Sequence, residues 1–357
     1  MAKRRHNFNA GPAALPTAVL EAARASLFDH AGAGAGILEI SHRSPEFQAV
    51  VDDCRARLTD LYAIPDSHEV MFLQGGASMQ FAMVPYNFGP GGAYIDTGTW
   101  STRALAEAQT IGEATGVWSG AEAGYRAVPA VDAQPKTPAG AAYLHYSGNN
   151  TIYGTAFHYV PRTDAPLVCD MSSEFLSAPV DVSRYALIYA GAQKNAGPSG
   201  VTVLIIDKRW SREFRGAATV PKILRYVTQA AKGSLYNTPN TFGIFAVGQV
   251  AKWVQSLGGL EAMAARAEAK ATKLYAAIDA HPLCTGHAVE HSRSHMNVTW
   301  RMQTEAQEKA FLAATAEAGM MGLKGHRSVG GLRASIYNAV EPASVDALIA
   351  LLEGFSG

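Results

Sequence analysis

The sequence predicts an α/β protein with a large domain built on a mainly parallel sheet and a smaller α+β domain. Short apolar runs alternate with longer helical stretches through the first 240 residues, a pattern typical of strands joined by crossover helices. These runs lack polar alternation, as expected where both faces of the sheet are covered. The 357 residues, 48% of them hydrophobic, are enough for one large domain and a smaller one.

The elements of the large domain can be predicted in order. Residues 16–28 and 46–62 have helical spacing of their apolar side chains. The strand candidates are the apolar runs 70–73, 93–96, 141–146, 167–170, 186–189 and 201–206. Only a short Gly/Pro turn separates the last two runs, so they are expected to be antiparallel. The Gly-, Ala- and Pro-rich stretch 119–140 is expected to be a surface excursion.

The pattern changes near the C-terminal third of the chain. The Ala-rich stretch 243–280 is predicted to be a helix that leads into the second domain. It is followed by alternating strand and helix candidates, at 296–302, 304–318, 332–337 and 343–354. This α+β order differs from the α/β order before it.

Composition excludes several classes of protein. With 30 basic and 30 acidic residues the formal net charge is zero, whereas a nucleic-acid binder usually has a basic excess. Cys54, Cys169 and Cys284 are far apart and odd in number, so neither a disulfide framework nor a metal site is predicted. No apolar run is long enough to span a membrane. We therefore expect a cytoplasmic protein without nucleic-acid or membrane partners.

Lys194 is the most informative residue. It lies in a tight turn between two apolar runs, at the expected end of a buried strand, and lysine is rarely buried without a partner or a chemical role. Asp170 ends an earlier apolar run. Together they suggest a Schiff-base lysine and a carboxylate for a pyridinium nitrogen, as in an enzyme that uses pyridoxal phosphate. Taken singly, Lys194 could be a solvated turn lysine, and Asp170 could cap the following turn.

Other strand ends carry polar residues that suit the same reading. Gln74-Gly-Gly-Ala77-Ser78 follows a strand and opens a helix, where backbone N–H groups can bind phosphate. Trp100 could stack on a flat ring, and Thr151 could reach a cofactor oxygen. The alternative for the glycine turn is a plain connection between strand and helix. Trp100 could instead be a core residue, and Thr151 could belong to an ordinary turn. The carboxyl ends of parallel strands share one edge of a sheet, where ligands bind.

Two basic clusters suggest an anionic substrate. One contains His42 and Arg43, and the other contains His326, Arg327 and Arg333. Guanidinium groups suit carboxylates and phosphates, and in a chain of zero net charge such clusters point to a small di- or trianion. The alternative for either cluster is a salt-bridged surface.

The sequence resembles the phosphoserine aminotransferase family of fold-type I pyridoxal-phosphate enzymes, class V. The similarity runs through nearly the whole chain. It includes Asn7-Phe-Asn-Ala-Gly-Pro12, Ser41-His-Arg43, Trp100, Ala190-Gly-Ala-Gln-Lys-Asn195, Tyr236-Asn-Thr-Pro239 and Lys324-Gly-His-Arg327 with Gly330-Gly-Leu-Arg-Ala-Ser-Ile-Tyr-Asn338. The resemblance implies a seven-stranded mixed sheet in a large domain, placed at 16–260, and a small domain formed by 1–15 and 261–357.

The resemblance also implies a role for each candidate residue. Lys194 and Asp170 would be catalytic. The cofactor would be held by Ala77, Ser78, Trp100, Thr151, Asp170, Gln193, Lys194, Asn237 and Thr238, the last pair reaching across a homodimer with shared active sites. The substrate would be bound by His42, Arg43, His326, Arg327 and Arg333. Some family members have an arginine at the position of Ser78 and a serine at that of Ala10, so this chain has one fewer positive charge near the substrate.

The implied reaction is amino transfer from L-glutamate to 3-phosphohydroxypyruvate, giving O-phospho-L-serine and 2-oxoglutarate by a ping-pong mechanism in serine biosynthesis. The related phosphorylated four-carbon acid of pyridoxine biosynthesis is a further possible substrate. Three alternatives remain: another small-molecule aminotransferase, a cysteine desulfurase using Cys284, and a pyridoxal-phosphate-binding protein without turnover. The basic clusters argue against the first, the residues around Cys284 against the second, and the presence of Lys194 with the arginines against the third.

Overall fold

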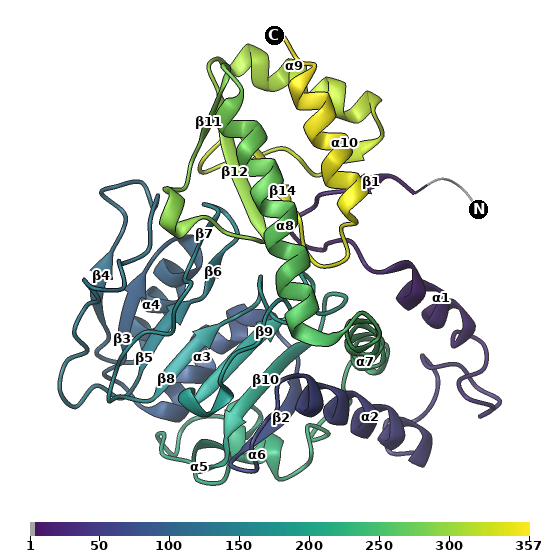
Figure 1. Ribbon diagram of the computed structural model, residues 1–357. Helices are drawn as coiled ribbons and strands as arrows, with labels where there is room; N and C mark the ends of the chain where they lie inside the picture. The colour runs from purple at the N-terminus through teal and green to yellow at the C-terminus, as the bar shows by residue number, and fades with distance from the viewer. Residues whose placement is uncertain (1–3) are drawn as a thin grey trace.

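A seven-stranded sheet forms the centre of the computed structural model, which describes residues 4–357 (Figure 1). The strand order is β2–β10–β9–β8–β5–β3–β4. β10 is antiparallel to both of its neighbours, and the other pairs are parallel. The bounds are β2 His68–Leu73, β3 Ala93–Asp96, β4 Thr115–Ser119, β5 Leu144–Ser147, β8 Leu167–Asp170, β9 Leu187–Gly191 and β10 Thr202–Asp207. The mainly parallel α/β sheet and its antiparallel β9–β10 pair are confirmed.

Helices cover both faces of this sheet. Successive residues of β2 belong to different buried clusters: Phe72 packs with residues of α2 and α7, and Leu73 with residues of α3 and α4. Burial on both faces explains why these strands have no polar alternation. The helices are α1 Thr17–Ala25, α2 Pro45–Leu61, α3 Gly76–Phe88, α4 Thr99–Ile111, α5 Lys208–Ser211, α6 Tyr226–Ala230 and α7 Thr241–Ser256. The short 3₁₀ turns are Val182–Arg184, Lys222–Leu224 and Glu290–Ser292.

A second, smaller sheet stands above the first in Figure 1. It has the order β11–β12–β14 and packs against α8, α9 and α10. Near the N-terminus β1 pairs in parallel with β13, which joins the first residues of the chain to this unit. The bounds are β1 His6–Asn7, α8 Gly259–Ala280, β11 Cys284–Gly286, β12 Asn297–Met302, α9 Glu305–Glu317, β13 Met320–Met321, β14 Leu332–Ser335 and α10 Pro342–Glu353.

The buried side chains around this second sheet form a cluster of their own. α8 contributes to both parts of the molecule, because Leu260 and Met263 at its start pack with the large sheet, and Leu274 and Ile278 near its end pack with the small one. The domain boundary at residue 260 stays a prediction, and residues 1–3 of the proposed small domain lie outside the described residues.

The expectations from the sequence were incomplete in three places. The stretch 243–280 is not one helix: α7 ends at Ser256 and α8 begins at Gly259, with Gly258 in the left-handed region at φ 100°. Edge strand β4 was not predicted, because its residues are half-buried or exposed and include a glycine. The hairpin of β6, Asn149–Asn150, and β7, Thr155–Ala156, was also missed; it is too short to show an apolar pattern.

Along residues 4–357, none of the helices combines the length and the apolar character that crossing a membrane would require.

The direction of the strands in the central sheet positions the candidate site. Because β2, β8 and β9 run in the same direction, their carboxyl ends meet at one edge. The Gly75–Gly76 turn, Asp170 and the turn that contains Lys194 all follow these ends.

Candidate active site

Lys194 lies in the turn after β9, which is closed by a hydrogen bond from Gly197 N to Ala192 O (2.8 Å). Its ammonium donates to Thr151 Oγ1 (2.7 Å) and lies 5.4 Å from the centre of the Trp100 ring. Burial lowers the pKa of Lys194 to about 8; Asp170 opposes this shift and Arg333 adds to it. The residue is therefore not a freely solvated turn lysine.

Asp170 is the last residue of β8 and is only 6% exposed. One carboxylate oxygen accepts from Ser172 N (2.9 Å), so Asp170 does cap the following turn. Burial raises the pKa of this carboxyl group, and the charge of Lys194 and the bond from Ser172 act in the opposite direction. Capping and a role at the site are thus compatible, because the bond from Ser172 N uses only one of the two carboxylate oxygens.

The turn between β2 and α3 can bind an anion. Gly75 has φ 94°, a left-handed conformation that favours glycine, and α3 begins at Gly76 without a side-chain cap. The first backbone N–H groups of the helix, which include those of Ala77 and Ser78, therefore lack intrahelical partners. Ala77 is half-buried and Ser78 is exposed. Gln193, also half-buried, precedes Lys194, and its backbone oxygen accepts from Ala13 N (3.0 Å).

Arg333 joins this edge from β14 of the small sheet. Its Nη1 donates to Thr151 O (3.3 Å), so one residue, Thr151, contacts both Lys194 and Arg333. Arg333 Nε is buried and has no hydrogen-bond partner among residues 4–357. Burial lowers the pKa of the guanidinium. An arginine with a free buried donor beside a reactive lysine suits a substrate carboxylate.

His326 adds to the positive charge of this region. Its Nδ1 forms a hydrogen bond with Ser328 Oγ (2.7 Å). Burial lowers the pKa of His326, and the charges of Arg333, Arg327 and Arg103 lower it further. The sequence reading did not include Arg103. Arg103 follows Trp100 by three residues on α4 and so lies on the same face, but no helix was predicted there.

The remaining predicted residues are not gathered at this edge by contacts within the chain. His42 and Arg43 lie in the turn before α2, and within the described 4–357 neither bonds to Lys194 or Arg333. Asn237 and Thr238 are exposed, and Gln74 Nε2 donates to Thr238 O (2.8 Å). The role of these four residues at a second subunit stays a prediction.

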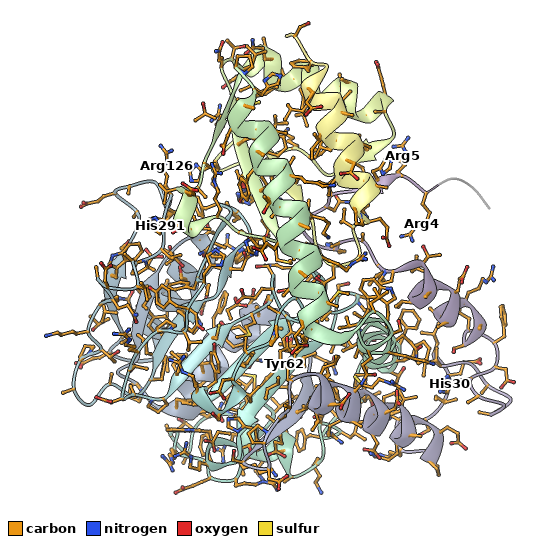
Figure 2. All side chains as sticks on the ribbon, in the orientation of Figure 1. Arg4, Arg5, His30, Tyr62, Arg126 and His291 are labelled. Carbon is orange, nitrogen blue, oxygen red and sulfur yellow. The ribbon has the colours of Figure 1, made fainter. Side chains whose placement is uncertain are left out.

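Two buried asparagines, to which the sequence analysis assigned no role, connect the site to the small sheet. Asn338 N donates to Asn195 Oδ1 (2.9 Å), next to Lys194. Both side-chain amides also donate to the loop after Asp170, at Phe175 O (2.7 Å) and Leu176 O (2.6 Å). Tyr62, labelled in Figure 2 near the lower end of α8, anchors this loop by accepting from Leu176 N (2.6 Å). These bonds fix the lysine turn relative to β14.

Cys284 has a different environment. It lies in β11, paired with Met302 of β12, and burial raises the pKa of its thiol to about 11. A thiol with a raised pKa is a poor nucleophile at neutral pH. This argues against a desulfurase reading, in agreement with the residues that flank Cys284 in the sequence.

Comparison with known proteins identifies the family. The Aminotransferase class-V family matches residues 5–348. The chain belongs to the class-V aminotransferases. It is 48% identical to a phosphoserine aminotransferase of Halalkalibacterium halodurans, over 99% of this chain and 98% of the relative.

Two solved structures match this class-V aminotransferase over nearly its full length. The phosphoserine aminotransferase of Bacillus circulans subsp. alkalophilus has a TM-score of 0.95 and 45% identity, covering 98% of each chain. A pyridoxal-phosphate-bound phosphoserine aminotransferase of Trichomonas vaginalis has a TM-score of 0.92 and 36% identity, covering 98% of this chain and 100% of the other. The fold class and the family resemblance are confirmed: the protein is a pyridoxal-phosphate-dependent transaminase with the fold of phosphoserine aminotransferases.

The described residues fit this cofactor. Trp100 Nε1 is a buried donor without a partner among residues 4–357, and the Lys194 ammonium lies over its indole ring, a flat surface on which a cofactor ring can stack. A Cβ built on Gly76 would meet no atom within 4 Å, so the N-terminus of α3 faces open space. Pyridoxal phosphate requires an amine, a carboxylate for its ring nitrogen and hydrogen-bond donors for its phosphate. Lys194, Asp170 and the N-terminus of α3 can supply them.

Proposed function

We propose that this chain transfers the amino group of L-glutamate to 3-phosphohydroxypyruvate, giving O-phospho-L-serine and 2-oxoglutarate, the aminotransfer step of serine biosynthesis. One observation carries the proposal: Lys194, with a lowered pKa, and Arg333 both contact Thr151, and the charges of Arg333 and Arg327 act on His326. The relatives and solved structures named phosphoserine aminotransferase support it.

Each residue then has a task. Lys194 would hold the cofactor and, with its amine free, would take the proton from Cα of the amino donor and return it at the end of the transfer. A pKa near 8 leaves part of the amine neutral near physiological pH, which a base requires. Asp170 would stabilise a proton on the nitrogen of the cofactor ring, and Trp100 would pack against that ring. When bound, pyridoxal phosphate withdraws electrons from Cα and carries the amino group between the two substrates.

The cationic residues account for the choice of substrates. Arg333, with its buried free Nε, would bind the α-carboxylate that both substrates share. His326 and Arg327 would bind the distal carboxylate of glutamate or the phosphate of the acceptor. One site can serve both half-reactions, because both substrates have an α-carboxylate and a distal anion.

We propose that His42 and Arg43 complete this distal site from a second subunit, and that Asn237 and Thr238 bind the phosphate of the other subunit's cofactor. The active sites would then be shared in a homodimer. We also propose a cytoplasmic location, and use of the phosphorylated four-carbon acid of pyridoxine biosynthesis as a second substrate. The exposure of Arg43, Asn237 and Thr238 supports the shared site.

A phosphorus NMR assay tests the reaction. Purified protein loaded with pyridoxal phosphate is mixed with L-glutamate and 3-phosphohydroxypyruvate, and the signal of O-phosphoserine is followed. We expect the signal with the unmodified chain and not with Lys194→Ala. If glutamate converts the cofactor to its amino form but no phosphoserine appears, the acceptor is a different keto acid.

A further inference from the structure

Arg103 is a cation of the active-site edge with no role in the mechanism above. It lies in the second turn of α4, and its guanidinium carbon is 5.2 Å from the centre of the Trp100 ring, the ring that Lys194 also approaches. Helical side chains lean toward the N-terminus of their helix, which directs Arg103 back over Trp100.

Arg103 does not use the acids that are near it in sequence. Glu107 follows it by four residues, a spacing at which helical side chains can meet, yet within residues 4–357 Arg103 has no ion pair. Asp96, just before α4, is occupied by four hydroxyl donors: those of Ser101, Thr102, Ser119 and Tyr125. The guanidinium keeps its donors free.

The surroundings of Arg103 have a surplus of positive charge. His326 comes from a loop more than 200 residues further along the chain, and its pKa is lowered by burial and by Arg333, Arg327 and Arg103. The three charged groups that act on His326 are all arginines, and no carboxylate contributes to the lowered pKa of His326. Such a cluster is stabilised by an anion. A cation–π contact with Trp100 would not by itself explain why the guanidinium approaches this loop.

We propose that Arg103 binds the distal anion of the substrate together with His326 and Arg327, and that it favours a phosphate over a carboxylate. This inference rests on the proposed function and names a further specificity-determining residue for it. Arg103 supplies a charge on the side of α4, whereas Ser78 at the start of α3 supplies none. Its fork can donate two hydrogen bonds to phosphate oxygens.

The test measures turnover with two acceptors, one with and one without a phosphate, and the dissociation constant of O-phospho-L-serine. Arg103→Ser and Arg103→Lys are assayed in the cofactor-loaded enzyme with 3-phosphohydroxypyruvate and with hydroxypyruvate, which lacks the phosphate. Binding of O-phospho-L-serine is measured by titration calorimetry. Lys309→Ser removes one positive charge from an exposed position of α9, far from α4 in Figure 1, and serves as the control.

For Arg103→Ser we expect kcat/KM for the phosphorylated acceptor to fall about 10- to 100-fold and O-phosphoserine affinity to fall in parallel. Activity with hydroxypyruvate should change less than about 3-fold, and Arg103→Lys should recover only part of the loss, because it keeps the charge but not the two-pronged donation. Equal losses with both acceptors, or no loss with either, would overturn the inference. If the unmodified enzyme neither binds nor produces O-phosphoserine, the proposed function itself fails.

Discussion

Lys270 is buried and Lys194 is half-buried, and the two lysines have opposite surroundings. Lys270, on α8, is 3% exposed and donates to Ile336 O (2.8 Å), Tyr337 O (2.7 Å) and Val340 O (2.9 Å). Its three N–H donors are therefore all used. Lys194 has one hydrogen bond, to a hydroxyl group. Burial lowers the pKa of both, to about 7 for Lys270 and about 8 for Lys194.

The difference shows that burial alone does not make a lysine reactive. The ammonium of Lys270 closes the loop between β14 and α10, and any reaction at its nitrogen would leave backbone carbonyls unpaired. Lys194 retains unused donors and faces Asp170, Arg333 and Trp100. Lys270, whose three N–H donors are all used, is thus a structural lysine. Lys194, with donors left unused, can change its hydrogen-bond partners during a reaction.

The largest expected effect is on turnover at Lys194. Lys194→Ala removes the amine that holds the cofactor and moves the proton, so kcat should fall about 10⁴-fold. The free energy of unfolding should change by less than about 1 kcal/mol, because a partly buried charge and only one hydrogen bond are lost. Single-turnover assays and urea unfolding measure the two quantities. Full turnover in this variant would refute the assignment.

Lys270→Met should show the reverse pattern. Methionine fills a similar volume but leaves three buried carbonyls without donors, so the free energy of unfolding should fall by about 4 kcal/mol. Turnover per folded molecule should stay within about 3-fold of the unmodified enzyme. Urea unfolding with Lys309→Met as an exposed control provides the measurement. A loss of turnover without a loss of stability would remove the contrast between the two lysines.

The charge of Asp170 should be visible in the titration of Lys194. In protein stripped of cofactor, the rate at which an amine-specific reagent labels Lys194 should rise with a midpoint near pH 8. Asp170 raises the pKa of Lys194, so Asp170→Asn should move the midpoint to lower pH. Labelling is followed by peptide mass spectrometry, with exposed Lys309 as internal reference. A midpoint that moves to higher pH contradicts the proposed pairing.

The smallest effect is expected at Thr151. Thr151→Val keeps the shape but removes the hydroxyl that accepts from Lys194 Nζ. Loss of one such bond should lower kcat about 5-fold. The backbone oxygen that Arg333 contacts remains, so KM for glutamate should stay within about 2-fold. Steady-state kinetics separates the two constants, and a rise in KM alone would assign Thr151 to substrate binding instead.

Much of the large sheet could be predicted from local sequence. Uninterrupted apolar runs predicted six of its seven strands, because strands buried on both faces leave no room for polar alternation. The edge strand β4, with half its surface in solvent, gave no such signal. The break between α7 and α8 was missed because alanine-rich sequence continues on both sides of it, and only the left-handed backbone of Gly258 separates the helices.

The sequence by itself determined the fold class and placed Lys194, Asp170 and the Gly75–Gly76 turn at one sheet edge. Each follows a strand, and parallel strands must end together. Only the tertiary structure decided which cations join them. Arg333, His326 and Arg103 come from segments far apart in the chain, and no local pattern relates their positions. Their proximity results from packing the small sheet over the large one, which fixes distances that sequence spacing leaves open.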